Sequence, residues 1–149
     1  MPGRSASVAP APALQFFMDR SLGSIIVPAA LRDADWVLET MDERYGVRAS
    51  QSIGDVQWIE EATENGDVLL CKDLRIASNP LEAAAVDRVS ARAFGLARRD
   101  IVGQAMVRYL LENELSIFRM ARRAYGPYVV SVSDSSNPRP LRRVRLNLP

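Results

Sequence analysis

Short apolar runs that stop at charged residues most constrain how this chain can fold. Residues 14–18 form one such run and end at Asp19, and residues 68–71 form another, followed by Lys72 and Asp73. Uniformly apolar runs of this length are typical of strands buried on both faces of a sheet. The longer segments between them carry apolar residues at helical spacing. The chain therefore predicts strands that alternate with helices.

Further strands are predicted from the same pattern at residues 36–39, 91–96 and 128–132. Helices are predicted at residues 21–35, 54–65, 81–88 and 100–125, the last capped by Asp100 and interrupted near Asn113. Residues 42–46 are predicted to be an acidic connection. Because strand–helix alternation implies right-handed crossovers, we predict an α/β fold with three layers, a mostly parallel sheet with helices on both faces. Ligands of such sheets bind outside the carboxyl ends of the strands.

A length of 149 residues suits one domain with its own core. We predict a flexible N-terminal tail (1–13), a folded domain (14–133) and an Arg-rich C-terminal tail (134–149) that is disordered or contacts RNA or an acidic partner. No stretch is apolar and long enough for a secretory signal or a membrane span. Since the single cysteine, Cys71, cannot form an intramolecular disulfide, we expect a cytoplasmic protein with no membrane association.

Histidine is absent from the sequence, and this absence excludes several kinds of active site. Ser-His-Asp and Cys-His catalysis, imidazole general bases and His-ligated zinc all require it. A single cysteine cannot build a Cys-based zinc site either. Catalysis would have to use carboxylates, other polar side chains or a metal ion held by oxygen, and Mg²⁺ and Mn²⁺ prefer oxygen ligands.

Three aspartates occupy positions where the expected fold would bring acidic side chains together. Asp19 and Asp73 follow strands, and Asp55 lies at the start of the helix at 54–65. If these carboxylates converge, their repulsion raises their pKa values unless a cation neutralises them. A divalent ion would neutralise them, activate a bound water and stabilise charge on a phosphate oxygen, so phosphodiester hydrolysis would need no histidine. Taken singly, each aspartate could instead be a helix cap or a turn residue.

The basic residues are arginines except Lys72, while the net charge is only +1. Arginine binds phosphate bidentately and stacks on bases, so the bias suits RNA, although a GC-rich coding bias would produce it equally. Arg20, Lys72 and Arg75 flank the three aspartates. They are candidates for binding an RNA phosphate, and the alternative is that they pair with the acids and orient them.

The stretches around these aspartates resemble the PIN-like nucleases, specifically the branch of the VapC-type toxin ribonucleases. They contain Asp-Arg-Ser-Leu-Gly at 19–23, a Trp-containing Asp motif at 54–59 and Lys-Asp-x-Arg-Ile at 72–76. Gly-Pro-Tyr at 126–128, before the last strand of the folded domain, also resembles that branch. The resemblance covers about residues 16–132, so both tails lie outside it.

This resemblance implies a Rossmann-like sheet and an endoribonuclease that uses Mg²⁺ or Mn²⁺, commonly a toxin held inactive by a small protein antitoxin. By motif position it assigns catalysis and metal binding to Asp19, Asp55 and Asp73. Glu39 and Asp42 remain candidates for a further metal ligand. The alternative is a PIN-like domain with weak or no catalysis that binds RNA or protein as a regulatory module. The apolar residues of the helix at 100–125 could be core or a homodimer face.

Overall fold

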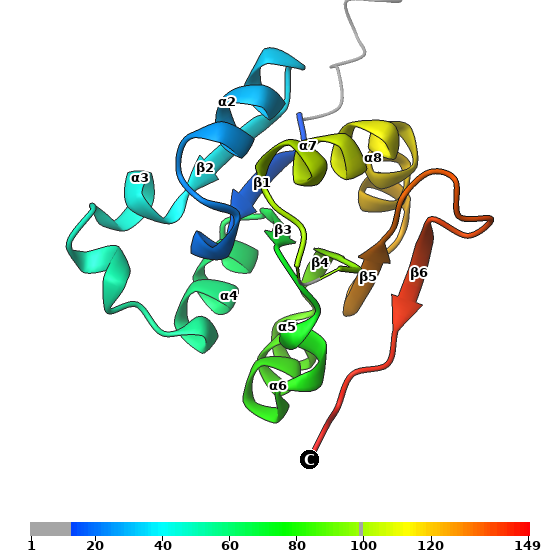
Figure 1. Ribbon diagram of the computed structural model, residues 1–149. Helices are drawn as coiled ribbons and strands as arrows, with labels where there is room; N and C mark the ends of the chain where they lie inside the picture. Colours follow the sequence, from blue (N-terminus) through cyan, green and yellow to red (C-terminus); the bar gives the residue numbers. More distant parts are fainter. Residues whose placement is uncertain (1–12, 99) are drawn as a thin grey trace, which may run out of the picture.

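The computed structural model describes residues 13–98 and 100–149, and in them one six-stranded sheet is covered by helices on both faces (Figure 1). The strands are β1 (Gln15–Met18), β2 (Val37–Thr40), β3 (Val68–Cys71), β4 (Arg92–Leu96), β5 (Tyr128–Val132) and β6 (Leu141–Val144). Their order is β2-β1-β3-β4-β5-β6, and the first five are parallel while β6 runs antiparallel to β5. The predicted three-layer α/β fold is confirmed.

The helices divide between the two faces of the sheet. One face packs against α2 (Ile26–Asp33), α7 (Gly103–Glu112) and α8 (Glu114–Arg123), and the other against α4 (Asp55–Glu64), α5 (Arg75–Ser78) and α6 (Pro80–Val89). The shorter elements are η1 (Arg20–Leu22), α3 (Met41–Tyr45) and η2 (Ala49–Gln51). None of the described helices is long and apolar enough to cross a membrane.

Two hydrophobic cores follow from the alternation of side chains along the strands. In β1, Phe16 and Met18 are buried with Leu31 of α2 and Leu110 of α7. Phe17 points to the opposite core, which it shares with Trp58 of α4. Both faces of β1 are therefore covered from Phe16 to Met18, as its largely apolar sequence predicts.

The structure differs from the expected elements in two places and confirms a third expectation. Residues 41–45 form α3 instead of a connection, because Thr40 and Glu43 make a reciprocal capping box. Asp100 does not cap the next helix, since α7 begins at Gly103 and Asp100 pairs with Arg98. The predicted interruption at Asn113 is confirmed, and it separates α7 from α8.

The C-terminal region is more ordered than its basic composition suggests. The interpretation of residues 134–149 as a disordered tail is wrong for Leu141–Val144, which form edge strand β6. Farther on, the N–H of Asn147 donates to the carbonyl of Ala77 at 2.8 Å, which holds the chain against α5. The predicted N-terminal tail lies outside the described residues except for Ala13.

Candidate active site

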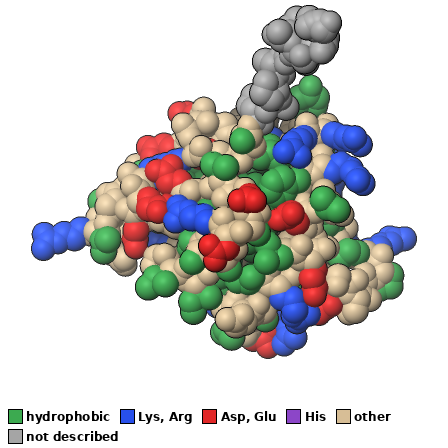
Figure 2. Space-filling model, turned by 90° about the horizontal axis from the view of Figure 1, so that it is seen from above, with side chains coloured by type: hydrophobic (Ala, Val, Ile, Leu, Met, Phe, Trp, Pro, Cys, Tyr) green, Lys and Arg blue, Asp and Glu red, His purple; other side chains and the backbone are tan. Residues whose placement is uncertain are grey.

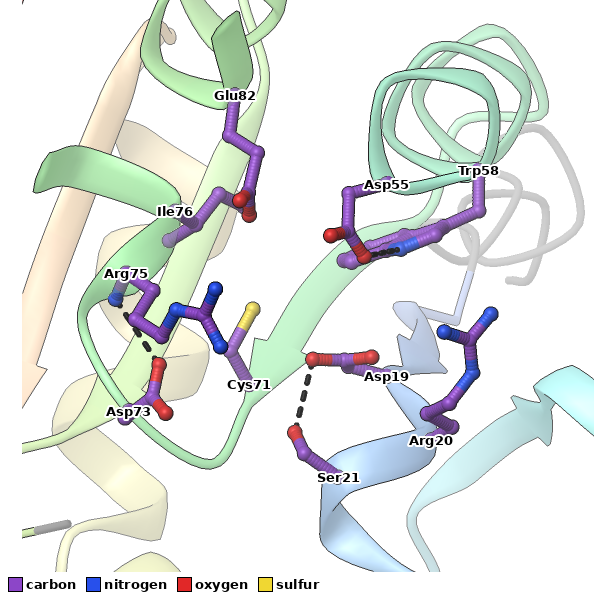
Figure 3. Close-up of a pocket in the computed structure, with 10 residues that line it drawn as sticks. All are labelled: Asp19, Arg20, Ser21, Asp55, Trp58, Cys71, Asp73, Arg75, Ile76 and Glu82. Carbon is purple, nitrogen blue, oxygen red and sulfur yellow. Dashed lines mark hydrogen bonds between the residues drawn. The ribbon is translucent and has the colours of Figure 1, made fainter. Parts of the chain in front are cut away.

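A pocket of about 220 Å³ lies at the carboxyl ends of β1 and β3, and four acidic side chains line it (Figure 3). Three are the predicted ones, Asp19, Asp55 and Asp73, and the fourth is Glu82. The parallel pairing of Met18 with Leu70 makes β1 and β3 end side by side. The sheet therefore brings Asp19 to the same edge as the turn that carries Asp73.

Backbone and side-chain hydrogen bonds position Asp19 and Asp55. The N–H of Asp19 donates to the carbonyl of Leu70 at 3.0 Å, so the residue remains fixed to β3 beyond the end of β1. Its Oδ2 accepts a hydrogen bond from Ser21 Oγ at 2.8 Å. Asp55 begins α4, where its Oδ1 accepts from Nε1 of the buried Trp58 at 3.0 Å. Each carboxylate is thus oriented by a neutral donor.

Asp73 lies in a tight turn between β3 and α5. Its Oδ1 accepts from the N–H of Arg75 at 2.9 Å, the local bond by which aspartate stabilises such turns. The turn passes directly over Gly95 of β4, where a Cβ atom would lie 2.4 Å from the carbonyl oxygen of Asp73. Only glycine at position 95 leaves room for this path, so β4 helps to place Asp73.

Glu82 is the acid that the sequence analysis missed. It belongs to α6, whose N-cap Asn79 accepts from the N–H groups of Leu81 and Glu82. The Glu82 side chain extends into the pocket opposite Asp55 (Figure 3), and the residue is only 8% exposed. A signal was present, since Glu82 lies at helical spacing from the core residues Ala85 and Val86. A carboxylate on the buried face of a helix costs free energy unless it is paired or binds a ligand.

Burial and neighbouring carboxylates disfavour the charged forms of Asp19 and Glu82. Burial raises the pKa of Asp19, and the nearby charge of Asp55 acts in the same direction. Burial, together with the charge of Asp55, raises the pKa of Glu82 to about 7. No acid of this pocket makes an ion pair with a basic side chain among the residues described. The pocket therefore holds four acids and two basic residues, Arg20 and Arg75, with no ion pair between them.

Cys71 ends β3 inside the same group of acids. Burial raises the pKa of its thiol, and the charges of Asp19 and Asp73 raise it further. A thiol in this environment remains protonated and is a poor nucleophile or metal ligand. The chemistry of the pocket accordingly rests on carboxylate oxygens.

Two of the three predicted phosphate-binding residues line the pocket, Arg20 and Arg75. The guanidinium of Arg20 donates to the carbonyls of Ser50 and Ile53, each at 2.7 Å, so it is fixed at the rim. The guanidinium of Arg75 points toward the pocket in Figure 3. Lys72 is not among the lining residues, and its charge acts on Asp100 instead.

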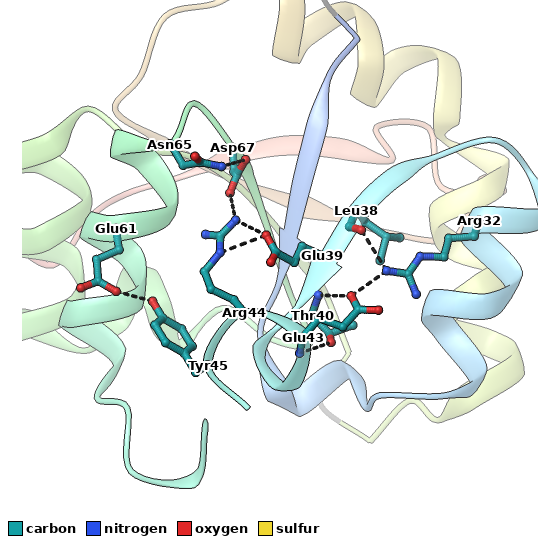
Figure 4. Close-up of polar contacts among 10 residues, drawn as sticks. All are labelled: Arg32, Leu38, Glu39, Thr40, Glu43, Arg44, Tyr45, Glu61, Asn65 and Asp67. Carbon is teal, nitrogen blue, oxygen red and sulfur yellow. Dashed lines mark hydrogen bonds and ion pairs between the residues drawn. The ribbon is translucent and has the colours of Figure 1, made fainter. Parts of the chain in front are cut away.

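The structure does not bring Glu39 and Asp42, the predicted candidates for a further metal ligand, into the pocket. Glu39 pairs with Arg44, which also binds Asp67 at 2.7 Å (Figure 4). Asp42 accepts a hydrogen bond from Ser50 Oγ at 2.5 Å. Both carboxylates have partners elsewhere, and Glu82 supplies the fourth acid of the pocket.

The donor set fits a hard divalent cation, because it offers four carboxylates and no nitrogen ligand. Within residues 13–98 and 100–149, however, no three acidic or cysteine side chains stand close enough to hold an ion as they are. Rotation of these side chains toward a common centre would be needed. Their mutual repulsion is a physical reason for them to stand apart without a cation.

Comparison with known proteins gives two matches. The family model described as "PIN like domain" matches residues 14–98. A Mycobacterium tuberculosis (strain ATCC 25618 / H37Rv) protein named "Putative ribonuclease VapC45" is 39% identical over 119 residues, which cover 80% of this chain and 86% of that protein. No solved structure matches the chain.

Proposed function

We propose that this chain, which belongs to the PIN-like domain family, is a metal-dependent endoribonuclease that hydrolyses RNA phosphodiester bonds. One observation carries the proposal: four carboxylates surround one pocket with no cationic partner among the described side chains. The name of the Mycobacterium tuberculosis relative supports ribonuclease activity and, through it, a role as the toxin of a toxin-antitoxin pair.

Asp19, Asp55 and Asp73 would hold the ion, Mg²⁺ or Mn²⁺, with Glu82 as a fourth ligand. When bound, such an ion supplies a Lewis acid for a phosphate oxygen and lowers the pKa of a bound water. Ser21 and Trp58 orient Asp19 and Asp55 through the hydrogen bonds described above. These neutral donors leave the negative charge of the carboxylates for the cation.

Arg20 and Arg75 would bind the phosphate that is cleaved. Arg20 is preorganised, since two backbone carbonyls fix its guanidinium, whereas Arg75 is free to follow the substrate. Bidentate contacts from arginine to phosphate oxygens position the group and offset its charge beside the acids. Lys72 lies outside the pocket and would contact more distant parts of the RNA.

The binding of RNA would depend on local contacts and not on the overall field of the protein. The net charge is +1, and Figure 2 shows acidic and basic side chains interspersed among hydrophobic ones on one face.

A small protein antitoxin is the expected partner of this protein, and the cytoplasm is the expected location. The ability to form a homodimer is a separate proposal: of the apolar residues of the helix predicted at 100–125, Met106, Tyr109 and Leu110 are buried core, whereas Val102 and Leu115 are exposed.

A second candidate function is a binding module with the PIN-like fold and no useful turnover. It is favoured by the absence, in the described part of the chain, of three acids already grouped to hold an ion. Such a module would bind RNA or protein without a metal requirement. The two functions therefore differ in their response to chelation.

Cleavage of a mixed RNA pool tests the proposal directly. Purified protein would be incubated with Mn²⁺, with Mg²⁺ and with EDTA, beside the variants Asp19→Asn and Asp73→Asn. We expect metal-dependent cleavage that each substitution lowers by about 100-fold or more, the order of effect for a lost catalytic group. Glu39→Gln is the matched control, since Glu39 lies outside the pocket, and it should leave the cleavage rate within about threefold. Cleavage that persists in EDTA or in both aspartate variants would eliminate this mechanism.

A further inference from the structure

We propose that a second pocket beside the acid pocket binds the nucleotide adjacent to the scissile phosphate, and that Arg145 contacts this nucleotide. The inference rests on the proposed function, because it assigns a subsite for the same RNA substrate. The pocket has a volume of about 210 Å³ and is lined by Leu74, Arg75, Ser78, Ala97, Val144 and Arg145.

The two pockets are neighbours because they share a residue. Arg75 lines both, and Leu74 directly follows Asp73 in the turn that connects them. That turn lies over Gly95, where the Cδ2 atom of Leu74 would be 3.0 Å from an added Cβ. A strand of RNA whose phosphate sits among the acids would therefore reach the second pocket by passing Arg75.

The C-terminal segment forms the far wall of this second pocket. Val144 at the end of β6 and Leu146 after it pack against the core beneath α4 to α6. Asn147 then anchors the chain, donating from its N–H to Ala77 O at 2.8 Å and from Nδ2 to Ser78 O at 2.9 Å. Arg145 is thus held between two fixed points, on the same side of the sheet as the acid pocket.

The lining chemistry suits a nucleotide. Leu74, Ala97 and Val144 provide an apolar surface for a base or ribose, and Ser78 provides a hydroxyl for hydrogen bonding. Arg145 makes no ion pair with any acidic side chain of the described residues. A guanidinium left without an acid can stack on a base or bind a phosphate bidentately.

A single-stranded RNA fits this arrangement better than a duplex. Bases of single strands can turn outward, enter small pockets and stack on planar side chains, while stacked bases of a duplex cannot. The second pocket is smaller than the roughly 300–1,000 Å³ of sites for larger ligands, which suits one nucleoside.

The test compares two arginines of the same strand region. Arg145→Gln removes the proposed contact, whereas Arg143→Gln removes the same charge from a residue that does not line the second pocket and lies 5.1 Å from the centre of the Tyr128 ring. A third variant, Ala97→Leu, fills the second pocket without changing charge. Binding of a fluorescein-labelled single-stranded RNA of ten nucleotides would be followed by anisotropy in EDTA over a range of salt concentrations.

We expect Arg145→Gln and Ala97→Leu to weaken RNA binding by about tenfold, the order of a lost base contact, and Arg143→Gln to change it by less than about twofold. For Arg145→Gln alone, the slope of log K against log salt should become shallower by about 0.7, the value for one phosphate contact on a single strand. The inference is overturned if Arg145→Gln behaves like Arg143→Gln, or if the wild-type chain does not bind RNA.

Cleavage assays on the same proteins separate this inference from the proposed function. If wild-type protein cleaves RNA with metal but Arg145→Gln binds normally, the second pocket is not a subsite and the nuclease proposal stands. If Arg145→Gln and Ala97→Leu lose binding but the wild-type protein never cleaves, the subsite stands and the nuclease proposal fails.

Discussion

Two acidic clusters of this protein differ in how their charge is compensated. In the first, the Arg44 cluster, the guanidinium of Arg44 binds Glu39 and Asp67 (Figure 4). It also lies 4.3 Å from the centre of the Phe17 ring. In the second, the acid pocket, four carboxylates accept hydrogen bonds only from neutral donors, and the two arginines that line the pocket make no ion pair with them among the described residues. The acids of the first cluster are paired within the chain, and those of the second are not.

This difference separates structural acids from candidate functional ones. Buried charge is costly unless it is paired, so a fold keeps paired acids for stability. Acids that remain unpaired at the carboxyl ends of parallel strands lower stability unless a ligand neutralises them. Removing a charge should therefore have opposite effects on the free energy of unfolding in the two clusters.

The largest expected effect is at Arg44. Replacement by Met leaves Asp67, whose side chain is 1% exposed, without its ion-pair partner. Breaking a buried pair in this way costs about 3–5 kcal/mol, so Arg44→Met should lower the free energy of unfolding by that amount in urea denaturation. The matched substitution in the pocket, Asp55→Asn, removes a repelling charge and should not destabilise metal-free protein. If both substitutions lower the free energy of unfolding equally, the acids of the two clusters do not differ in their contribution to stability.

A smaller effect is expected from the pH dependence of stability in the acid pocket. The pKa of Glu82 is about 7 in the fold against 4.5 for an unperturbed glutamate, so the folded state favours the protonated form. The contribution of protonated Glu82 to the free energy of unfolding is fully present below pH 4.5 and is lost as the pH rises through about 7. In EDTA, wild-type protein should lose up to about 3 kcal/mol of stability between pH 4.5 and pH 8 relative to Glu82→Gln.

Urea denaturation of both proteins at these pH values measures this difference. The raised pKa of Asp19 acts in the same direction and remains in both proteins, so it does not obscure the comparison. If the free energies of unfolding of wild type and Glu82→Gln change equally with pH, Glu82 carries no unfavourable charge in the pocket.

The smallest effect on stability is expected at Gly95. An added Cβ would lie 2.4 Å from the main-chain oxygen of Asp73, which cannot rotate away. Gly95→Ala should cost about 2 kcal/mol as an overpacking substitution and should reduce RNA cleavage at least tenfold, because the turn that carries Asp73 must shift.

Gly54→Ala is the control for this substitution. Gly54 precedes Asp55, has φ of −74° and has nothing within 4 Å of an added Cβ. It should lose at most about 1 kcal/mol through a poorer helix N-cap and should retain cleavage. Equal loss of cleavage in both variants would mean that the position of Asp73 is not the sensitive feature.

The sequence was sufficient for the five parallel strands of the sheet and for three of the four pocket acids. The strands ending before Asp19 and Asp73 could be predicted because both are short and mostly apolar, as strands covered on two faces are. Their parallel arrangement then determined that the two acids share an edge. The prediction of this shared edge depends only on the local pattern of apolar residues and on the handedness of crossovers.

The sequence was not sufficient where contacts depend on how neighbouring elements fold together. Glu39 and Asp42 were selected because residues 42–46 were predicted to be a connection, so their contacts with Arg44 of α3 and Ser50 of η2 were not recognised. The spacing of Glu82 from Ala85 and Val86 placed it on the buried face of a helix, but the packing of α6 against α4, which brings it opposite Asp55, has no local signature.

Strand β6 was missed for a different reason. Its two central residues are arginines, and a basic segment rich in proline nearby suggested disorder. Its pairing with β5 depends on the free edge of that strand, which the local sequence does not reveal.

Thermal unfolding with and without Mn²⁺ tests most directly whether the acid pocket is a cation site. At Mn²⁺ about 100-fold above its dissociation constant, binding should stabilise the wild-type protein by about 2.7 kcal/mol and raise its Tm by roughly 5–10 °C. Asp19→Asn and Asp73→Asn should show a much smaller rise. A wild-type Tm that does not respond to Mn²⁺ or Mg²⁺, or an equal rise in both variants, would contradict a metal site in this pocket.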